Sequence, residues 1–326
     1  MEMNIMRASI VIAAYNEGFR LWKTVRSCIE TTRRLDCELV VADDGSNDGS
    51  VDELRCRFPQ VRVVGSSRRR GCSPAKNDAA RAARGKVLVF LDGHCKPEPG
   101  AITRLVSDVE KLSGNAIVTP SVPALDERRW RNSLFHIGSG FQLDLETLDG
   151  RWLDMDNMTV YNRVRNRRMY LSPNFVGCCV AMSRRLYAKL WGFDPDMRCW
   201  GTEDVDLGLK AWLMGYRVLH DPRAVIGHRF RKAFDNYTVP LEHVLANTLR
   251  MARKNFTDQV WVDWLRRAKM RLADWPWEKA WRLFARRRTS VERERSYLMR
   301  HRVRDEFWYA ANFHLKWPDQ GTVAKL

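Results

Sequence analysis

Residues 86–94 read KVLVFLDGH, an apolar run that ends in the polar tripeptide Asp92-Gly93-His94. An unbroken run of this kind is typical of a strand that is buried on both faces of a parallel sheet. Open α/β sheets bind their ligands at the carboxyl ends of such strands, which is where Asp92 and His94 stand. A carboxylate and an imidazole one residue apart can turn toward one divalent cation, and mixed oxygen and nitrogen ligation suits Mn²⁺ better than Ca²⁺. The tripeptide therefore predicts a metal site at the edge of a parallel sheet.

Strand and helix patterns alternate around this run. We expect further strands at residues 8–14, 38–42 and 61–64, and helices at residues 21–32, 51–58 and 76–84. Such alternation indicates a parallel sheet with right-handed crossovers. Further on, the sequence predicts strands and loops at 115–175, a strand and a helix at 176–191, a helix at 203–214, and short strands at 217–220 and 224–226. The predicted fold class is therefore α/β, with a doubly wound, mostly parallel sheet.

The composition excludes several classes of protein. With 326 residues, 45% of them hydrophobic, the chain is long enough to bury a core and is not disordered. No apolar stretch approaches the roughly 20 residues that span a bilayer, and residues 1–7 lack the apolar segment of a signal peptide. The eight cysteines include no Cys-x-x-Cys pair, which favours free thiols over a disulfide framework or a zinc site. We therefore expect a cytoplasmic protein.

The charge is strongly basic and unevenly distributed. A formal net charge of +17 favours contact with anions, whether nucleotide diphosphates, nucleic acid or an acidic membrane surface. Residues 239–326 carry 19 Lys and Arg against 10 Asp and Glu, together with seven of the 13 tryptophans, and their pattern becomes helical. We therefore divide the chain into an α/β domain at 1–238 and a basic, Trp-rich helical region at 239–326.

Two segments near the N-terminus resemble the start of family 2 glycosyltransferases: VIAAYNE at 11–17 and VVADDGS at 40–46. The resemblance implies a GT-A fold in which these turns hold the uridine of a nucleotide-sugar. On the family pattern, Asp44 accepts a hydrogen bond from the uracil N3–H. The residues implied in nucleoside binding are Ala13, Tyr15, Glu17 and Asp44. From the residues alone, Asp-Asp-Gly-Ser is also an ordinary turn with Asx capping.

The segment from Gly71 to Asn77 resembles the glycine-to-arginine-asparagine segment of the same family, with Lys76 where an arginine is usual. A cation at this position can approach the diphosphate, although lysine is a point charge without the two-pronged geometry of arginine. The alternative is a solvated helix start. Further along, Gly177 in NFVGCC (174–179) matches the place where such enzymes put a small-residue loop under the donor sugar, and a core strand with a bulge is an equally good interpretation.

Three ordered motifs resemble the polypeptide N-acetylgalactosaminyltransferases: FLDGHC (90–95), WGTEDVDL (200–207) and GHRFR (227–231). In that family an Asp-x-His pair and one distant histidine hold the metal. The resemblance, which covers about residues 8–235, implies Asp92, His94 and His228 as ligands of Mn²⁺ or Mg²⁺, with the phosphates of UDP completing the shell. Taken alone, a histidine after a short strand is usually structural.

The resemblance further implies that Trp200 to Asp206 form the acceptor and catalytic segment. A carboxylate at the head of a helix can contact the sugar or abstract a proton from the attacking hydroxyl. Asp204 corresponds to the base of inverting enzymes, whereas Glu203 corresponds to the glutamate of a retaining family, so the stereochemical outcome stays open. The same residues also suit a helix N-terminus that is capped by Thr202.

The helical region leaves the acceptor open. The lectin domain of the polypeptide-transferring family is β-rich with cysteine pairs, whereas residues 239–326 contain no cysteine. Basic helices with tryptophans could lie on an anionic membrane and serve a lipid-linked glycan, hold nucleic acid, or bind a peptide. Alternatively, the tryptophans only pack these helices onto the α/β domain while the charges face water.

Together these features predict a metal-dependent glycosyltransferase that moves a hexose or N-acetylhexosamine from a UDP-sugar to an acceptor hydroxyl on a glycan, lipid-linked glycan or peptide. The protein would be cytoplasmic, either free or peripheral to a membrane. The rival interpretations are a transferase that glycosylates a hydroxylated base in DNA and a non-catalytic nucleic-acid-binding protein on the same fold. A nucleotidyltransferase would show a glycine-rich first turn, which residues 13–17 do not provide.

Overall fold

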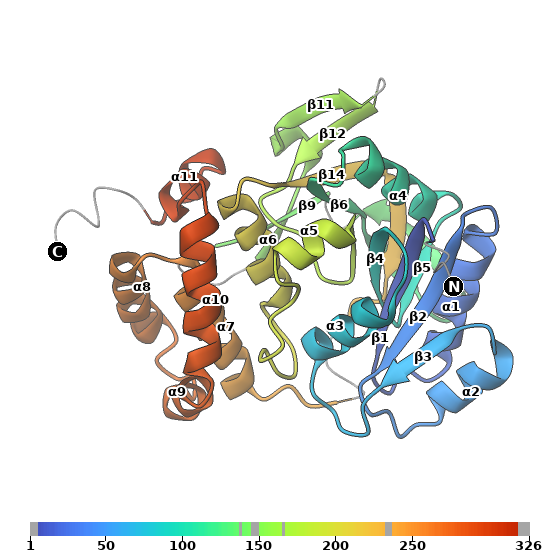
Figure 1. Cartoon of the computed structure of the whole chain (residues 1–326), viewed down its shortest axis with the longest axis horizontal. Coiled ribbons are helices and arrows are strands. Elements are labelled where there is room, and N and C mark those ends of the chain that lie inside the picture. The colour runs from blue at the N-terminus through green and yellow to red at the C-terminus, as the bar shows by residue number, and fades with distance from the viewer. Residues whose placement is uncertain (1–5, 137–138, 145–149, 165–166, 232–236, 319–326) are drawn as a thin grey trace, which may run out of the picture.

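A sheet forms the centre of the computed structural model, which describes residues 6–136, 139–144, 150–164, 167–231 and 237–318 (Figure 1). Its first half consists of four parallel strands: β1 (Ala8–Ala14), β2 (Cys37–Asp43), β3 (Arg62–Gly65) and β4 (Val87–Asp92). The helices between them are α1 (Phe19–Thr31), α2 (Ser50–Arg57) and α3 (Cys72–Ala82). β1 and β4 pair in the middle of the sheet and are buried along nearly their whole length, as their apolar sequences require.

The second half of the sheet is mixed. It contains β6 (Ala116–Ser121), β13 (Cys179–Ser183) and β14 (Arg217–His228). β14 is parallel to β6, whereas β13 is inserted between β4 and β6 and is antiparallel to both. The connecting helices are α4 (Ala101–Lys111), α5 (Arg184–Lys189) and α6 (Glu203–Leu213). The predicted α/β class with a mostly parallel sheet is confirmed.

Short strands lie between residues 95 and 171, on either side of α4, and the sequence predicted strands and loops for the part from 115 to 175. They are β5 (Cys95–Pro97), β7 (Pro123–Asp126), β8 (Arg131–His136), β9 (Gly140–Leu143), β10 (Gly150–Leu153), β11 (Val160–Val164) and β12 (Arg167–Leu171), with a 3₁₀ turn at Met155–Asn157. β11 and β12 extend the main sheet beyond β14, while β9 and β10 form a separate pair.

β14 replaces the two short strands predicted at 217–220 and 224–226. It pairs with β6 from Arg217 to Asp221, and the register shifts before Val225. The prediction was wrong because Asp221-Pro222 looks like a strand end, whereas proline is tolerated at such irregularities. Beyond the shift, β14 pairs antiparallel with β5, so that His228 lies opposite Cys95. The metal-site histidine predicted far along the chain is thereby brought next to His94.

Two helix starts follow local chemistry. α3 begins at Cys72 rather than at the predicted residue 76, because Gly71 adopts φ +111° immediately before it and Pro74 is accepted within a first turn. α6 begins at Glu203 as predicted, with Glu203, Asp204 and Asp206 in its first turn, where the helix dipole favours negative charge.

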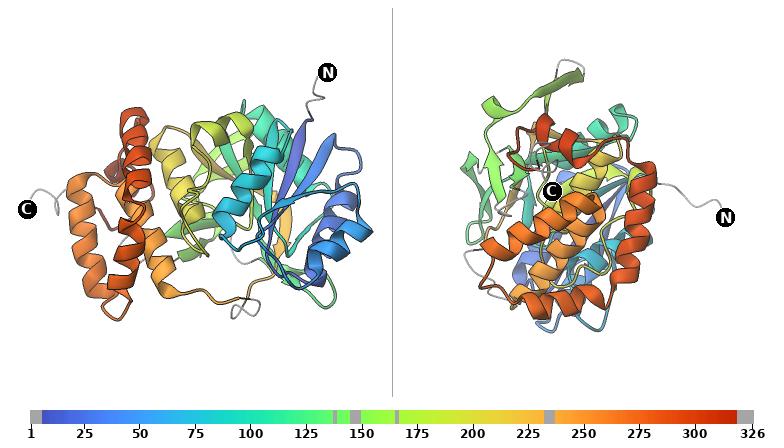
Figure 2. Two further views of the ribbon diagram at one scale, coloured as in Figure 1. Left: turned by 60° about the horizontal axis from the view of Figure 1, so that its bottom comes forward. Right: turned by 90° about the vertical axis from the view of Figure 1, so that its left-hand side faces the viewer.

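Within the described residues 237–318, the C-terminal region forms five helices: α7 (Leu241–Asn255), α8 (Asp258–Arg271), α9 (Trp277–Ala285), α10 (Arg288–His301) and α11 (Glu306–Asn312). Figure 2 shows them gathered at one end of the molecule. One hydrophobic cluster runs from Phe90 on β4 through Trp212 on α6 to Leu249 on α7 and Trp264 on α8. No helix in the described residues is long and apolar enough to cross a membrane.

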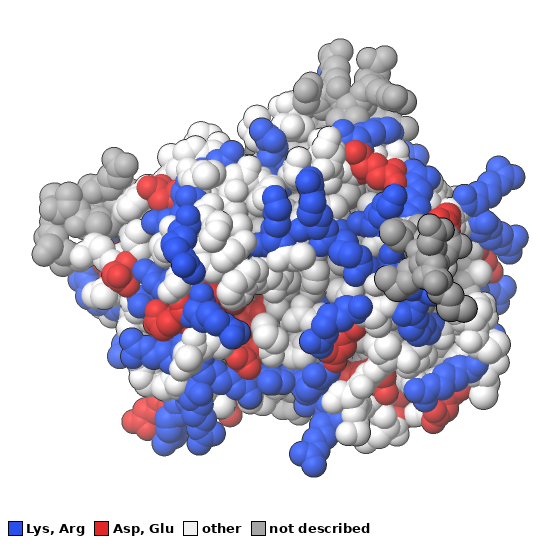
Figure 3. Space-filling view, viewed as in Figure 1, with Lys and Arg blue, Asp and Glu red and all other residues white. Residues whose placement is uncertain are grey.

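Most tryptophans of this region face the core. Trp261, Trp264 and Trp317 are buried, whereas Trp281 is 40% exposed. Trp275, Trp277 and Trp308 are partly buried against the same cluster. The packing alternative therefore accounts for six of the seven side chains. The basic residues lie largely on the surface, where Lys and Arg side chains spread over the face drawn in Figure 3.

A buried polar network joins the helical region to the α/β part. The Lys254 Nζ on α7 lies 2.7 Å from Asp194, 2.7 Å from Asp206 on α6 and 3.2 Å from Glu294 on α10. Arg250 adds a two-pronged contact with Asp194, at 2.9 and 2.8 Å. Such pairs contribute little net stability but are costly to break, because the remaining charge has no water around it.

Candidate active site

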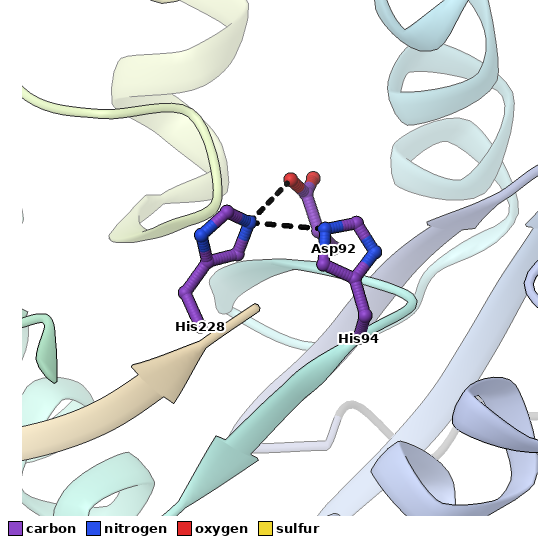
Figure 4. A group of neighbouring side chains, drawn as sticks. All are labelled: Asp92, His94 and His228. Carbon is purple, nitrogen blue, oxygen red and sulfur yellow. Dashed lines mark hydrogen bonds and ion pairs between the residues drawn. The ribbon is translucent and has the colours of Figure 1, made fainter. Parts of the chain in front are cut away.

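Asp92, His94 and His228 converge at the carboxyl end of β4 (Figure 4). One ligand atom of each lies within 4.8 Å of the others. The Nε2 atoms of His94 and His228 are 3.0 Å apart, and His228 Nε2 is 3.6 Å from an Asp92 oxygen. The structure therefore brings together the three residues that the motifs pointed to, from β4, the turn after it and the end of β14.

Glu17 and Arg231 orient the ring of His94. Its Nδ1 lies 3.0 Å from a Glu17 oxygen, and Arg231 donates to the other Glu17 oxygen at 2.8 Å. Burial opposes ionisation of Glu17, but His94 and Arg231 outweigh it and hold its pKa below the ordinary value. An ionised carboxylate beside Nδ1 favours the tautomer that carries its proton there, and it turns Nε2 of His94 toward His228.

The donor set fits a divalent cation. Burial lowers the pKa of His228 to about 4, so this imidazole is neutral at pH 7. Burial disfavours the charge on Asp92, but Lys76 and the two histidines outweigh it and lower its pKa, so this carboxylate is ionised. Adjacent ligands about 2.1 Å from an octahedral ion stand about 3.0 Å apart, as the two Nε2 atoms do. Two imidazole nitrogens and one carboxylate suit Mn²⁺ or a similar ion.

Lys76 connects this cluster to the predicted catalytic segment. Its Nζ donates to the Gly177 carbonyl at 3.0 Å and to Glu203 at 3.3 Å, and it stands 3.9 Å from Asp92. The side chain is 2% exposed, so the alternative of a solvated helix start is wrong. Burial disfavours the charged amine, but Glu203 and Asp92 outweigh it and raise its pKa, so Lys76 is a cation at neutral pH.

Glu203 and Asp204 are adjacent carboxylates in different surroundings. Glu203 accepts from Lys76 and lies 3.1 Å from the Cys72 thiol. Asp204 accepts the Gly177 N–H at 2.8 Å, and burial, followed by repulsion from Glu203, raises its pKa to about 6. Thr202 stands at the N-cap position of α6 as the sequence suggested, but its hydroxyl donates to the Gly201 carbonyl and makes no capping hydrogen bond.

Gly177 and Trp200 complete this side of the site. Gly177 lies in the loop before β13, with its N–H on Asp204 and its carbonyl on Lys76. A Cβ added at Gly177 would lie 3.1 Å from the Lys76 amine, so the glycine permits this close approach. Trp200 is 43% exposed in the loop that precedes α6.

The predicted nucleoside residues lie along the ends of β1 and β2. Asp44 accepts the N–H groups of Arg70 and Gly71 at 2.8 and 2.7 Å, and burial raises its pKa to about 6 against those bonds. The Asx turn belongs to Asp43, which accepts the Ser46 N–H at 2.8 Å. In β1, Ala13 lies beside Asp92 in register.

Tyr15 belongs to an aromatic group that the sequence did not predict. The Arg69 guanidinium lies 4.7 Å from the Tyr15 ring and 4.2 Å from the Tyr237 ring, and the two rings meet edge to face at 5.8 Å. Arg69, Tyr237 and Arg231 contact predicted site residues, but only Arg231 lies within a quoted motif. Since these contacts join distant parts of the chain, no local pattern could have indicated them.

Comparison of the sequence with models of known protein families agrees with this arrangement of sheet, Asp92–His94–His228 group and carboxylate pair. The family model described as glycosyl transferase family 2 matches residues 9–191, and the model described as the N-terminal domain of galactosyltransferase matches residues 160–233. The chain belongs to glycosyl transferase family 2. Within this family 2 member, the matched region extends from β1 to α5 and so contains Asp92 and His94.

Similar proteins include polypeptide N-acetylgalactosaminyltransferase 12 of Mus musculus, which is 29% identical over 271 residues. That alignment covers 80% of this family 2 chain and 44% of the relative, so the chain spans less than half the length of that protein.

Solved structures share the GT-A fold. A structure of GalNAc-T7 with UDP, GalNAc and Mn²⁺ superposes with a TM-score of 0.70 and 22% identity, covering 97% of this family 2 chain and 59% of that one. The mannosyltransferase PcManGT from Pyrobaculum calidifontis, in complex with GDP-Man and Mn²⁺, gives a TM-score of 0.52 and 20% identity, covering 90% and 85%.

Proposed function

We propose that this protein is a metal-dependent glycosyltransferase that transfers a hexose or N-acetylhexosamine from a UDP-sugar to an acceptor hydroxyl. The observation that carries the proposal is the meeting of Asp92, His94 and His228 within 4.8 Å, with Lys76 linking Asp92 to the Glu203 carboxylate. Family membership supports the reaction class. The Mn²⁺ and UDP named in the GalNAc-T7 structure support the choice of cofactor and donor.

Asp92, His94 and His228 would hold the Mn²⁺ ion. When bound, such an ion supplies positive charge that neutralises the leaving diphosphate. Glu17 and Arg231 keep the His94 ring in the orientation that presents Nε2. Asp44 and the residues Ala13 and Tyr15 hold the nucleoside, with the Asp44 carboxylate accepting the uracil N3–H.

Lys76 places a buried positive charge between the metal cluster and Glu203. It stabilises the ionised form of Asp92. Both the protonated and the ionised form of Asp204 are populated close to neutral pH, since its pKa is about 6. A group with that pKa is suited to accept a proton from an attacking hydroxyl. Trp200 and Gly177 border the space in which the donor sugar and the acceptor would meet.

We propose a glycan or a peptide as the acceptor, because the sequence relatives are named for transfer to polypeptides. The packing of the Trp-rich helices into the core removes the main reason for preferring nucleic acid or a membrane surface. A reducing compartment such as the cytoplasm is proposed as the location, supported by the eight free cysteines.

The test is UDP release and product mass with purified protein, Mn²⁺ and a panel of UDP-sugars, adding glycan, peptide and modified DNA acceptors separately. We expect release of UDP that requires Mn²⁺ and is lost in Asp92→Ala. The variant Asp52→Ala, at an exposed position on α2, serves as the control. Full activity in metal-free buffer would contradict the mechanism. Glycosylated DNA as the product would show that the acceptor is a nucleic acid rather than a glycan or a peptide.

A further inference from the structure

The loop that precedes α6 is held by one side chain from the helical region. On α7, the Asn247 Nδ2 lies 2.9 Å from the Arg198 carbonyl and 3.2 Å from each of the carbonyls of Trp200 and Gly201. Its Oδ1 accepts the Arg198 N–H at 3.1 Å. The Asn247 side chain is 2% exposed, so water does not replace these contacts. A single amide thus engages four backbone groups of the 198–201 loop.

This loop needs support because its backbone is strained. Cys199 has φ +61°, Gly201 has φ +105° and Thr202 has φ +64°. Residues other than glycine rarely adopt this left-handed region of φ, and they remain there only where surrounding contacts fix the backbone. Without such contacts the loop would relax, and Trp200 would move with it.

On its other side, the loop meets the donor half of the site. Cys199 and Gly71 form an isolated parallel bridge, in which the Cys72 N–H donates to the Cys199 carbonyl at 3.3 Å. The Gly71 N–H in turn donates to Asp44. The 198–201 loop therefore lies between the predicted nucleoside site and α7, two residues before Glu203.

We propose that Asn247 is a positioning residue for the transfer reaction. It fixes the 198–201 loop so that Trp200 and Glu203 face the donor sugar, although Asn247 itself touches no substrate. This inference rests on the proposed function. It also assigns the helical region a part in the reaction, since the amide comes from α7.

The amide is specifically required by the contact pattern. It offers one acceptor to an N–H and two donor hydrogens to three carbonyls. Alanine would remove this partner from the Arg198 N–H and from the carbonyls of Arg198 and Trp200, whereas the Gly201 carbonyl would keep the Thr202 hydroxyl. Aspartate could still accept the Arg198 N–H, but it has no hydrogen to donate and would place negative charge against three carbonyls.

The test compares Asn247→Ala and Asn247→Asp with Thr248→Val. Thr248 is the next residue on α7, is also 2% exposed, and donates its hydroxyl to the Val244 carbonyl, away from the loop. We expect both Asn247 variants to lower the kcat of Mn²⁺-dependent UDP release by about tenfold to a hundredfold, with the KM for the UDP-sugar changed by less than about twofold. Amide exchange at Arg198 should accelerate by about tenfold in Asn247→Ala, because the N–H loses a buried contact, and by less in Asn247→Asp, whose carboxylate can still accept it.

Thr248→Val should match the wild type in kcat and in Arg198 exchange. An unchanged kcat in Asn247→Ala, or an equal loss of kcat in Thr248→Val at equal thermal stability, would overturn the inference. If the wild type releases no UDP from any sugar, the proposed function is wrong. Unaltered exchange at Arg198 in both Asn247 variants would overturn the inference whether or not turnover is found.

Discussion

A single side chain, Glu17, decides what His94 can do. The sequence placed Glu17 in the nucleoside turn, whereas its carboxylate lies between His94 and Arg231. Since a glutamate in this position fixes the tautomer of a histidine ligand, it contributes to metal affinity without touching the ion. Each Glu17 oxygen keeps a second lone pair beside these contacts, and the nucleoside role of Glu17 stays a prediction.

Glu17→Gln should weaken Mn²⁺ binding by about 10- to 100-fold, the effect typical for loss of a partner behind a histidine ligand. The amide can still accept one hydrogen bond, but it cannot balance both His94 and Arg231. Titration calorimetry with Mn²⁺ checks this. Glu30→Gln, a pair with Arg26 on the surface of α1, is the control and should bind as the wild type does. Equal affinities in all three proteins would contradict the orienting role.

Asp44 should make nucleoside binding pH-dependent. Its pKa is raised to about 6, so the carboxylate is ionised at pH 7 and becomes protonated as the pH falls through 6. If the ionised form accepts the uracil N3–H, uridine affinity should fall by about tenfold between pH 7 and pH 5. Uridine alone is the ligand to use, because it carries no phosphate and needs no metal. In Asp44→Asn the affinity should be low and independent of pH, and a wild-type affinity constant over this range would contradict the contact.

Among single residues, those that lie at strand ends could be predicted from short sequence motifs. Asp92 and His94 could be predicted because their spacing after an apolar strand limits where they point. Asn247 could not, because an asparagine inside a helix has no local signal for a loop 46 to 49 residues away. The same holds for Arg69, whose aromatic partners are far apart in sequence.

Among the elements, the bridge between Gly71 and Cys199 joins the start of α3 to the loop before α6. A Cβ at Gly71 would lie 2.5 Å from the Cys199 nitrogen, and its φ of +111° is unfavourable for any side chain. These two elements carry Lys76 and Glu203, so the bridge sets the distance between a buried cation and its carboxylate.

Gly71→Ala should therefore cost about 1–3 kcal/mol of unfolding free energy and also reduce turnover. Gly100→Ala is the matched control, because Gly100 has φ +79° but no atom within 4 Å of the added Cβ. It should lose stability through backbone strain alone and keep its activity. Urea denaturation and UDP release separate the two effects. Equal turnover in both variants would contradict a role for the bridge.

The order and type of the elements in the first half could be predicted because alternating patterns and glycine-rich turns are local signals. The antiparallel insertion of β13 could not, since strand direction depends on which neighbours are already in place. The single strand β14 was also missed, because its register shift near Asp221 resembles a chain break.

In the whole molecule, the helical region and the sheet share one core and one polar network. Lys254 is fully buried among Asp194, Asp206 and Glu294, which come from three different parts of the chain. Sequence composition showed that the region is basic and rich in tryptophan, but it could not show that most of these side chains point inward. Composition counts residues and does not assign them to a face.

Lys254→Met should destabilise the protein by about 3–5 kcal/mol, because it removes the cation that all three buried carboxylates share and leaves them with Arg250 and Lys210. Lys279→Met, at an exposed position on α9, should change stability by less than about 0.5 kcal/mol. The measurement is the free energy of unfolding in urea. A small effect of the Lys254 change, similar to that of Lys279, would show that the network is not needed to join the two parts.

The register shift in β14 limits where related proteins can gain or lose residues. Side chains along a strand alternate between its two faces, so removing one residue between Asp221 and Val225 would rotate His228 toward the opposite face. Insertions and deletions should thus be tolerated in the short strand pairs β9–β10 and β11–β12. Between Asp221 and Val225, however, they should abolish metal binding. A relative with an alignment gap between Asp221 and Val225 should therefore not bind the metal ion.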